Sequence, residues 1–235
     1  MKVLTRIIKN RFEKGKKILD FGCGGGDLVQ ELLDLGYDVY GTDIHFKNGE
    51  NRDRLIEQKK LVVIENIESR SNIDSAAYRI PFNEDEFDIV IADQTIEHVE
   101  NLEQFIHESK RVLKKGGIFF GYFPSRFKLI EPHVGVPMGG IINNKLYYKI
   151  CYKLGLCYKK VKSAEDLIKY MNNDVYYRSD NEIKDHFKKY FSNVEFKPEL
   201  ILKNIDRKSA KIIQKIPLGT SIFGKLWSKF IICKD

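Results

Sequence analysis

Residues 17–29 read Lys-Ile-Leu-Asp-Phe-Gly-Cys-Gly-Gly-Gly-Asp-Leu-Val, and this stretch decides the fold. Residues 17–19 predict a short buried strand, residues 20–26 a glycine-rich turn, and the spaced leucines of 27–36 a helix with one apolar face. Glycine accepts positive φ and lets the backbone approach a ligand closely. The free N–H groups of a helix N-terminus attract a ligand that carries negative charge. The stretch therefore predicts a nucleotide-type binding site.

The spacing of the glycines separates this turn from the dinucleotide-binding fingerprint. That fingerprint, G-x-G-x-x-G, would need a third glycine at Asp27 or at Val29. The turn instead holds the carboxylate of Asp20, two residues before Gly22 and four before Gly24. A negative charge here repels a pyrophosphate but suits a cationic group such as an amino-acid ammonium. The alternative is an ordinary strand-to-helix turn with an incidental acid.

The pattern D-x-G-x-G-x-G at residues 20–26 resembles the first motif of the class I S-adenosylmethionine-dependent methyltransferases. Two later strings are similar to the fourth and fifth motifs of such enzymes acting on small molecules. These are F-D-I-V-I-A-D-Q-T-I-E-H-V at residues 87–99 and R-V-L-K-K-G-G at residues 111–117. The resemblance covers residues 17–123 and implies an α/β fold with a Rossmann-like, doubly wound sheet. That sheet has seven strands, mostly parallel with an antiparallel last strand, and helices on both faces.

The resemblance also implies S-adenosyl-L-methionine as cofactor and assigns roles to single residues. Asp43 ends the second predicted strand about 20 residues beyond the turn, where the family's acid takes both ribose hydroxyls. Its alternative role is a helix N-cap. Ile44 resembles the residue against the adenine face, and Asp74 the one that meets the adenine amino group. The full set expected at the cofactor is Asp20, Gly22, Cys23, Gly24, Asp43, Ile44, Asp74, Asp93 and Gln94.

Length and composition favour one domain over residues 1–235, because 235 residues with 43% hydrophobic content suffice for one full α/β core. The formal charge of +7 is compatible with acidic substrates, nucleic acid or an anionic membrane surface. The four cysteines form no C-x-x-C pair, and no secretory leader is recognisable, so we expect a cytoplasmic location without disulfides. No apolar run approaches the ~20 residues that span a bilayer, although peripheral membrane contact stays open.

Further elements follow from hydrophobic periodicity. The third strand lies either at residues 61–64 or near Asn72, and Ser179 or Asp180 caps a helix that runs to residue 190. The other expected helices are 1–16, 52–60, 102–113 and 208–215, and the other expected strands are 38–43, 87–92, 118–123, 194–197 and 228–234.

Residues 124–171 depart from the minimal fold, and we expect them to form a lid inserted directly after the fifth strand. An insertion there hangs over the methyl end of the cofactor. Its F-P-S-R and E-P-H-V strings are similar to strings in uncharacterised bacterial methyltransferases. The basic, aromatic residues 145–160 are expected to be helical.

The chemistry of methyl transfer points to histidine. A sulfonium methyl is displaced in line, and a hydroxyl nucleophile benefits from a base whose pKa lies near neutrality. His133, beside Glu131 on the expected lid, is the first candidate base, with a turn-capping or surface role as alternative. His98 is the second candidate, although a structural hydrogen bond to the backbone is favoured for it. Arg126 and Glu131 are expected to bind substrate, Arg126 through a carboxylate or phosphate unless it faces solvent.

A metal site is the alternative use of the same residues. Asp93 and Glu97 are four residues apart and would share one helix face, with His98 adjacent and His133 completing an Mg²⁺ or Mn²⁺ site. Ubiquinone-type O-methyltransferases carry comparable acid and E-H strings that hold a metal. Otherwise Glu97 is expected to cap the helix.

These observations predict a methyltransferase acting on a hydroxyl of a small molecule, such as a sugar, a glycan precursor or a quinone-like compound. A nucleic-acid methyltransferase, for RNA in particular, is the first alternative because of the positive charge, although the chain has no N-P-P-Y-type string. The second is a nucleotide-binding protein without catalysis, which would keep Asp20 and Asp43 but lack a working base.

Overall fold

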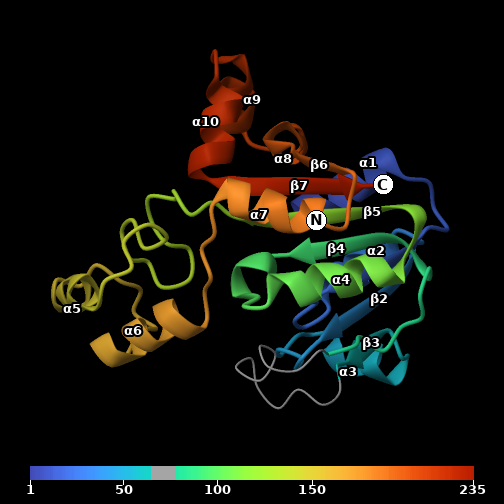
Figure 1. Cartoon of the computed structure of the whole chain (residues 1–235), viewed down its shortest axis with the longest axis horizontal. Coiled ribbons are helices and arrows are strands. Elements are labelled where there is room, and N and C mark those ends of the chain that lie inside the picture. The colour runs from blue at the N-terminus through green and yellow to red at the C-terminus, as the bar shows by residue number, and fades with distance from the viewer. Residues whose placement is uncertain (65–77) are drawn as a thin grey trace.

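The computed structural model describes residues 1–64 and 78–235, so Asp74 and Asn72 lie outside the described residues. One sheet of seven strands runs through the molecule in the order β3-β2-β1-β4-β5-β7-β6 (Figure 1). Its strands are β1 (Lys17–Phe21), β2 (Asp38–Asp43), β3 (Leu61–Val63), β4 (Phe87–Asp93), β5 (Leu113–Pro124), β6 (Asn193–Phe196) and β7 (Ser228–Lys234).

The strand directions confirm the expected sheet. Strands β1 to β5 pair in parallel, whereas β7 is antiparallel to both of its neighbours, β5 and β6. β3 occupies the first of the two positions expected for the third strand. The continuous apolar run of β4 fits its central place, because a parallel strand is covered on both faces.

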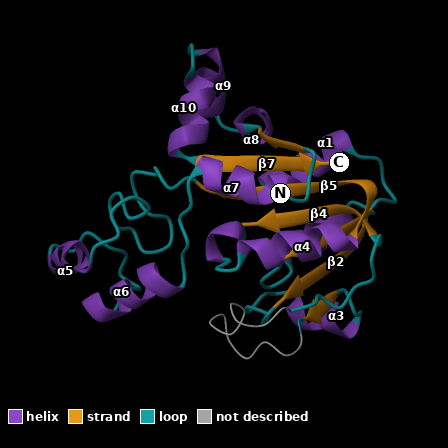
Figure 2. Ribbon diagram, in the orientation of Figure 1, coloured by secondary structure: helices purple, strands orange, loops and turns teal. Residues whose placement is uncertain are grey.

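Helices cover both faces of the sheet (Figure 2). One core layer lies under α1 (Val3–Arg11), α2 (Asp27–Asp34) and α8 (Pro198–Asn204), and the other under α4 (Leu102–Val112) and α7 (Asp180–Lys188). Neighbouring residues of β5 point to opposite layers, Phe119 to the second and Phe120 to the first. The predicted doubly wound architecture is thereby confirmed.

The remaining helices show where periodicity was less informative. α3 (Arg52–Glu57) and α9 (Lys208–Lys215) lie where helices were expected, and Ser179 forms a capping box at the start of α7. α6 (Ala164–Asn173), α8 and α10 (Gly219–Leu226) were not expected. α5 (Lys145–Lys153) is shorter than predicted, because the chain turns at Gly155 with a φ of +69°. Within residues 1–64 and 78–235, no helix is both long and apolar enough to cross a membrane.

Residues 125–179, here called the β5–α7 segment, lie at one end of the molecule and carry α5 and α6 (Figure 1). The segment has an apolar cluster of its own, in which Val134 and Tyr148 pack with Leu167 and Met171. Val175 joins the same cluster. The expected boundary at residue 171 therefore falls inside α6 and its packing.

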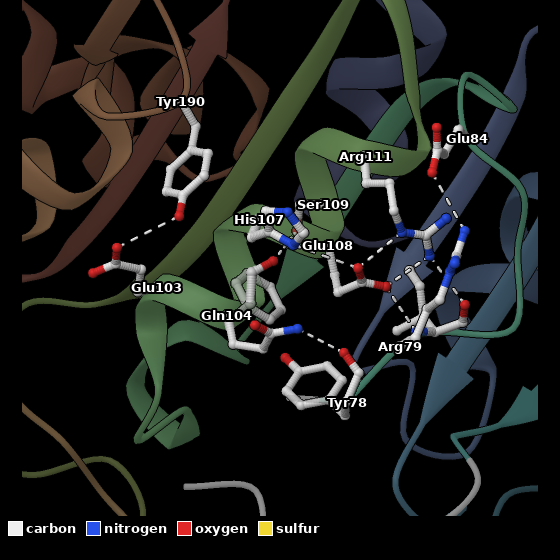
Figure 3. A network of polar contacts seen from close by, with 12 residues as sticks. Tyr78, Arg79, Glu84, Glu103, Gln104, His107, Glu108, Ser109, Arg111 and Tyr190 are labelled. Atoms are coloured by element: carbon white, nitrogen blue, oxygen red, sulfur yellow. Dashed lines mark hydrogen bonds and ion pairs between the residues drawn. The ribbon is translucent and has the colours of Figure 1, made fainter. Parts of the chain in front are cut away.

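A polar network fastens residues 78–82 to α4 (Figure 3). Glu108 is buried, receives the Arg111 guanidinium at 2.6 and 2.8 Å, and accepts the backbone N–H of Ile80 at 2.8 Å. Arg111 also donates to the carbonyl oxygens of Ile80 and Phe82. Gln104 donates to the carbonyl oxygen of Tyr78 at 2.6 Å. These bonds hold Tyr78 beside the cleft described next.

Candidate active site

The glycine turn after β1 has the backbone that a close ligand approach requires. Gly22 and Gly24 have φ values of +87° and +58°, which L side chains rarely adopt. Gly22 donates its N–H to the carbonyl oxygen of Thr42 at 2.8 Å, which ties the turn to β2. A Cβ atom at Gly22 would lie 2.4 Å from the Thr95 side chain. Glycine is therefore required at this position.

A cleft opens at the carboxyl ends of β1, β2 and β4, where ligands bind in open α/β sheets. It encloses about 730 Å³, a volume that includes its open mouth and the solvent in front of it. Five of the predicted residues line it. In the described part of the chain the lining consists of Phe21, Gly22, Asp43, Ile44, Lys47, Ile64, Tyr78, Gln94, Thr95, His98, Val99, Glu100, Phe105 and Tyr176.

Asp43 stands in the cleft wall at the end of β2. Its two carboxylate oxygens accept the backbone N–H groups of Gly24 and Ile44, each at 2.8 Å. Asp43 is followed by an irregular stretch, so the alternative of a helix N-cap is wrong. Each oxygen retains a further lone pair, and the carboxylate can accept hydroxyl groups from the cleft.

Asp20 is buried beneath the glycine turn, with 1% of its surface exposed. Its Oδ1 atom has no hydrogen-bond partner among the described residues. Burial, reinforced by the negative charge of Asp93, raises the pKa of Asp20 to about 8. The ammonium of Lys2 lies 3.4 Å from Oδ2 of Asp93 and lowers the pKa of Asp20. A buried carboxylate with an unused oxygen fits a cationic ligand group.

Four of the other residues predicted at the cofactor do not line the cleft. Asp20, Cys23, Gly24 and Asp93 are not among the cleft's lining residues in the described parts of the chain. The thiol of Cys23 packs against Gly41, where an added Cβ would lie 2.8 Å from the sulfur. Gly24 shapes the wall through its bond to Asp43.

The chain after β4 is not the helix that the metal hypothesis assumed. Gln94 has a φ of +55°, and only a 3₁₀ turn, η2 (Ile96–His98), follows. Asp93 and Glu97 therefore do not share a helix face, and this expectation is wrong. The expected capping role of Glu97 is wrong as well, because Asn101 caps α4 by accepting the N–H of Gln104 at 3.0 Å.

Glu97 is instead a buried carboxyl group. Neither of its oxygens has a hydrogen-bond partner among the described residues, and burial, reinforced by the charges of Asp93 and Glu131, raises its pKa to about 8. It lines a second hollow together with Arg126, whose Nε is also buried without a partner among those residues. Arg126 is half-buried, so the alternative of a solvent-facing arginine is wrong.

Two histidines from distant parts of the chain meet at the cleft. The rings of His98 and His133 lie edge to face, with 4.7 Å between their centroids. His98 Nδ1 lies 2.6 Å from the carbonyl oxygen of Asp174, which confirms the predicted bond to the backbone. His133 Nδ1 lies 2.7 Å from Oε1 of Glu131. Both rings are therefore held in fixed orientations.

Glu131 is the centre of the polar contacts in the β5–α7 segment. It is 1% exposed and accepts bonds from the N–H groups of His133 and Val134 and from the hydroxyl of Tyr177 at 2.7 Å. Burial alone would raise the pKa of Glu131, but these hydrogen bonds outweigh it and hold the pKa below its usual range. The carboxylate is thus ionised and turned toward the protein's own donors, among which His133 is the one beside the cleft.

Glu97, His98 and His133 form the cluster that could hold a metal ion. One ligand atom of each lies within 4.8 Å of the others. Asp93 was expected in this group, but it pairs with the ammonium of Lys2 instead. Lys2 is held in place because its backbone N–H donates to Glu31 at 2.8 Å, at the start of α1.

Comparisons with known proteins relate this chain to methyltransferases. The family model of a methyltransferase domain matches residues 19–121, which run from β1 to β5. Residues 19–121 therefore carry a methyltransferase domain. Over 107 residues it is 34% identical to a ubiquinone biosynthesis O-methyltransferase of Pelagibacter ubique, covering 46% of this chain and 41% of that protein. The match thus spans less than half the length of this curated relative.

Solved structures share the fold of this methyltransferase domain over the whole chain. An S-adenosylmethionine-dependent methyltransferase from Mesorhizobium loti superposes with a TM-score of 0.55 at 11% identity, covering 100% of this chain and 98% of that one. Phosphoethanolamine N-methyltransferase 2 of Haemonchus contortus, in complex with S-adenosyl-L-methionine, gives 0.52 at 14% identity, covering 98% and 50%. At these identities the likeness concerns the fold alone.

Some residues of the candidate site escaped sequence reasoning. Thr95 lies in the quoted string after β4, and its packing against Gly22 is a tertiary contact across 73 positions that the string itself does not indicate. Tyr176 lines the cleft and Tyr177 binds Glu131, yet both lie far along the chain from their partners. No local pattern marks them, because their positions depend on how the β5–α7 segment packs.

Proposed function

We propose that the protein transfers a methyl group from S-adenosyl-L-methionine to a hydroxyl of a small molecule. The observation that carries the proposal is the buried carboxyl of Asp20, with an unused oxygen beneath a glycine turn. Asp20 would hold the amino-acid ammonium, Asp43 the ribose hydroxyls, and Ile44 the adenine face. When bound, the cofactor supplies an electrophilic methyl group on sulfur.

His133 would act as the base that takes the proton from the acceptor hydroxyl. Because the ionised Glu131 accepts the Nδ1–H, the Nε2 atom of His133 is left to receive a proton. The β5–α7 segment would serve as lid, excluding water where the hydroxyl meets the methyl group. Arg126, in the hollow beside Glu97, would pair with an anionic group of the acceptor.

The acceptor class follows from this arrangement. A hydroxyl nucleophile requires a general base to take its proton, and an oriented histidine can act as that base. The name of the Pelagibacter relative, an O-methyltransferase of ubiquinone biosynthesis, supports a quinone-like hydroxyl among the candidates, beside sugars and glycan precursors. The cytoplasm remains the expected location, since the four cysteines are free.

A metal-assisted version of the same reaction is favoured by one observation. Glu97 offers two buried oxygens beside His98 and His133, and each histidine has an acceptor at Nδ1, as metal-ligating histidines do. In that version an Mg²⁺ or Mn²⁺ ion would hold the acceptor oxygen and lower its pKa.

The proposal is tested first by titrating the protein with S-adenosylhomocysteine in a calorimeter, with NAD as the comparison ligand. We expect micromolar binding of S-adenosylhomocysteine only, and an affinity at least roughly tenfold weaker in Asp43→Ala, about 1.4 kcal/mol. Asp38→Ala is the matched control, because it removes the same side chain at the opposite end of β2, where Asp38 pairs with Lys60. Preference for NAD, or no binding at all, would contradict the proposal.

A further inference from the structure

The outer face of α5 carries a row of exposed apolar side chains. Leu146, Ile150 and Leu154 follow at intervals of four residues, so they lie on one side of the helix, and they are 67%, 47% and 65% exposed. Tyr148 and Cys151 point the other way into the core of the β5–α7 segment. The helix therefore packs on the segment through Tyr148 and Cys151. The exposed row of apolar side chains takes no part in that packing. In Figure 1, α5 lies at the end of the molecule farthest from the sheet.

A row of lysines runs beside the apolar row. Lys145, Lys149 and Lys153 each precede one of the three apolar residues, and all three are exposed. Within residues 1–64 and 78–235 none of these lysines forms an ion pair. The sequence has no aspartate or glutamate between Glu131 and Glu165, so no acid from this stretch neutralises them.

The surface continues past the end of α5. Leu156 and Tyr158 are each 45% exposed, and Lys159 and Lys160 follow them on the surface. Exposed apolar and cationic side chains thus extend together over residues 145–160. A folded protein rarely leaves such a combination unused, because contiguous exposed apolar surface is costly in water.

We propose that the outer surface of α5, made of Leu146, Ile150 and Leu154 with Lys145, Lys149 and Lys153, docks on an anionic lipid bilayer. Apolar side chains on one flank enter the boundary between headgroups and acyl chains, while lysines on the other flank meet the lipid phosphates. Lysine suits this position, since its long stem lies along apolar surface while the ammonium stays among the headgroups. A nucleic acid would match the lysines but leave the apolar row in water.

The α5 surface and part of the cleft lining belong to the same β5–α7 segment, which contributes Tyr176 to the cleft. The same β5–α7 segment carries His133, which meets His98 at the wall of the cleft. If the proposed function holds, an acceptor dissolved in or anchored to the membrane is the class that such docking would serve. The docking itself does not depend on any activity and is tested without one.

The experiment is flotation of the purified full chain with lipid vesicles. One set contains phosphatidylcholine alone and the other phosphatidylcholine with phosphatidylglycerol. We expect binding to the second set only, weakened by salt, because the lysines act through charge. The variant L146S/I150S/L154S and the variant K145Q/K149Q/K153Q are each expected to bind at least roughly tenfold less.

The matched control is I212S/I216S/I222S, which removes three exposed apolar side chains from the surface of α9 and α10. We expect it to bind as the unmodified protein does. All variants change exposed residues, and circular dichroism with thermal unfolding checks that each is folded. Unchanged binding by the α5 variants, or loss only in the control, would overturn the proposal. Binding of a DNA duplex without binding of vesicles would also overturn the proposal. A third contrary outcome is a dimer, seen by light scattering, that is lost in L146S/I150S/L154S while the unmodified protein binds no vesicles.

Discussion

At the scale of single residues, Asp20 is a carboxyl group whose charge depends on pH. Its pKa is raised to about 8 by burial and by Asp93, so in the free protein it is mostly protonated at neutral pH. Holding an ammonium requires the ionised form. We therefore expect the affinity for S-adenosylhomocysteine to rise between about pH 6.5 and about pH 8.5, with proton release on binding near neutrality. Calorimetry in buffers of different ionisation enthalpy measures both.

The variant Asp20→Asn tests two effects of this carboxyl group, one on ligand binding and one on the pH dependence of stability. In the unfolded chain the Asp20 carboxyl ionises near pH 4, whereas in the folded chain it stays protonated up to about pH 8. Because the unfolded chain loses this proton first, the contribution of Asp20 to the free energy of unfolding declines as the pH rises from about 4 to about 8. Asparagine carries no charge and removes that decline. We expect the free energy of unfolding of Asp20→Asn, relative to the unmodified protein, to increase by about 3–4 kcal/mol from pH 5 to pH 8. Retained ligand binding by this variant would contradict the assigned role.

His133 is the residue whose role in the reaction is most directly testable. Once an acceptor is found by screening hydroxylated compounds, we expect His133→Ala to lower kcat by about 10²–10⁴-fold with little change in KM. His107→Ala is the control, since His107 is an exposed histidine of α4 with 52% of its side chain accessible.

The same assay distinguishes the base from a metal ligand. If His133 acts as base, a chelator leaves the rate unchanged. Loss of activity with a chelator and recovery with Mg²⁺ or Mn²⁺ would instead assign Glu97, His98 and His133 to a metal ion.

At the scale of elements, α4 organises the part of the chain that reaches the cleft through Tyr78. The pair of Glu108 and Arg111 is nearly buried, with 2% and 9% of the side chains exposed, and it satisfies the backbone of residues 80–82. We expect Glu108→Ala to lower the free energy of unfolding by about 3–5 kcal/mol, because it leaves the Arg111 charge buried without its partner. Chemical denaturation measures this. Glu103→Ala, on the exposed side of the same helix, is expected to leave stability nearly unchanged.

The pH dependence of this pair has the opposite sign to that of Asp20. Burial works against ionisation of Glu108, but the hydrogen bonds from Arg111 and Ile80 outweigh it and lower the pKa. The stabilisation is therefore present above the unfolded pKa of about 4.3 and is lost as the pH falls through the lower folded value. Stability of Glu108→Gln is expected to vary less with pH in that acidic range.

At the scale of the whole molecule, two separately packed bodies meet at the cleft. The sheet with its two core layers presents the carboxyl ends of β1, β2 and β4, and the β5–α7 segment has its own apolar cluster. The backbone N–H of Tyr176 donates to the carbonyl oxygen of Glu97 at 2.7 Å and so joins the segment to η2. The family match ends at residue 121, before this segment begins. Whatever distinguishes the acceptor of this protein from those of its relatives is therefore expected to lie in the segment.

The sequence by itself determined the sheet and the cofactor end of the candidate site. The glycine turn with Asp20, the apolar run of β4 and the acid that ends β2 are local patterns. Local patterns are set by backbone conformation and by neighbours a few residues away. They therefore predicted the strand-turn-helix unit, the parallel strands and the placement of Asp43 in the cleft wall.

Only the tertiary structure decided how the distant residues combine. His133 meets His98 across 35 positions of sequence, and Tyr177 binds Glu131 across 46, because the cluster around Tyr148 packs the β5–α7 segment against itself. The left-handed turn at Gln94 removed Asp93 from the expected metal group. Such contacts form because segments far apart in the chain bury apolar surface against each other. The periodicity within either segment does not indicate which distant segment it will contact.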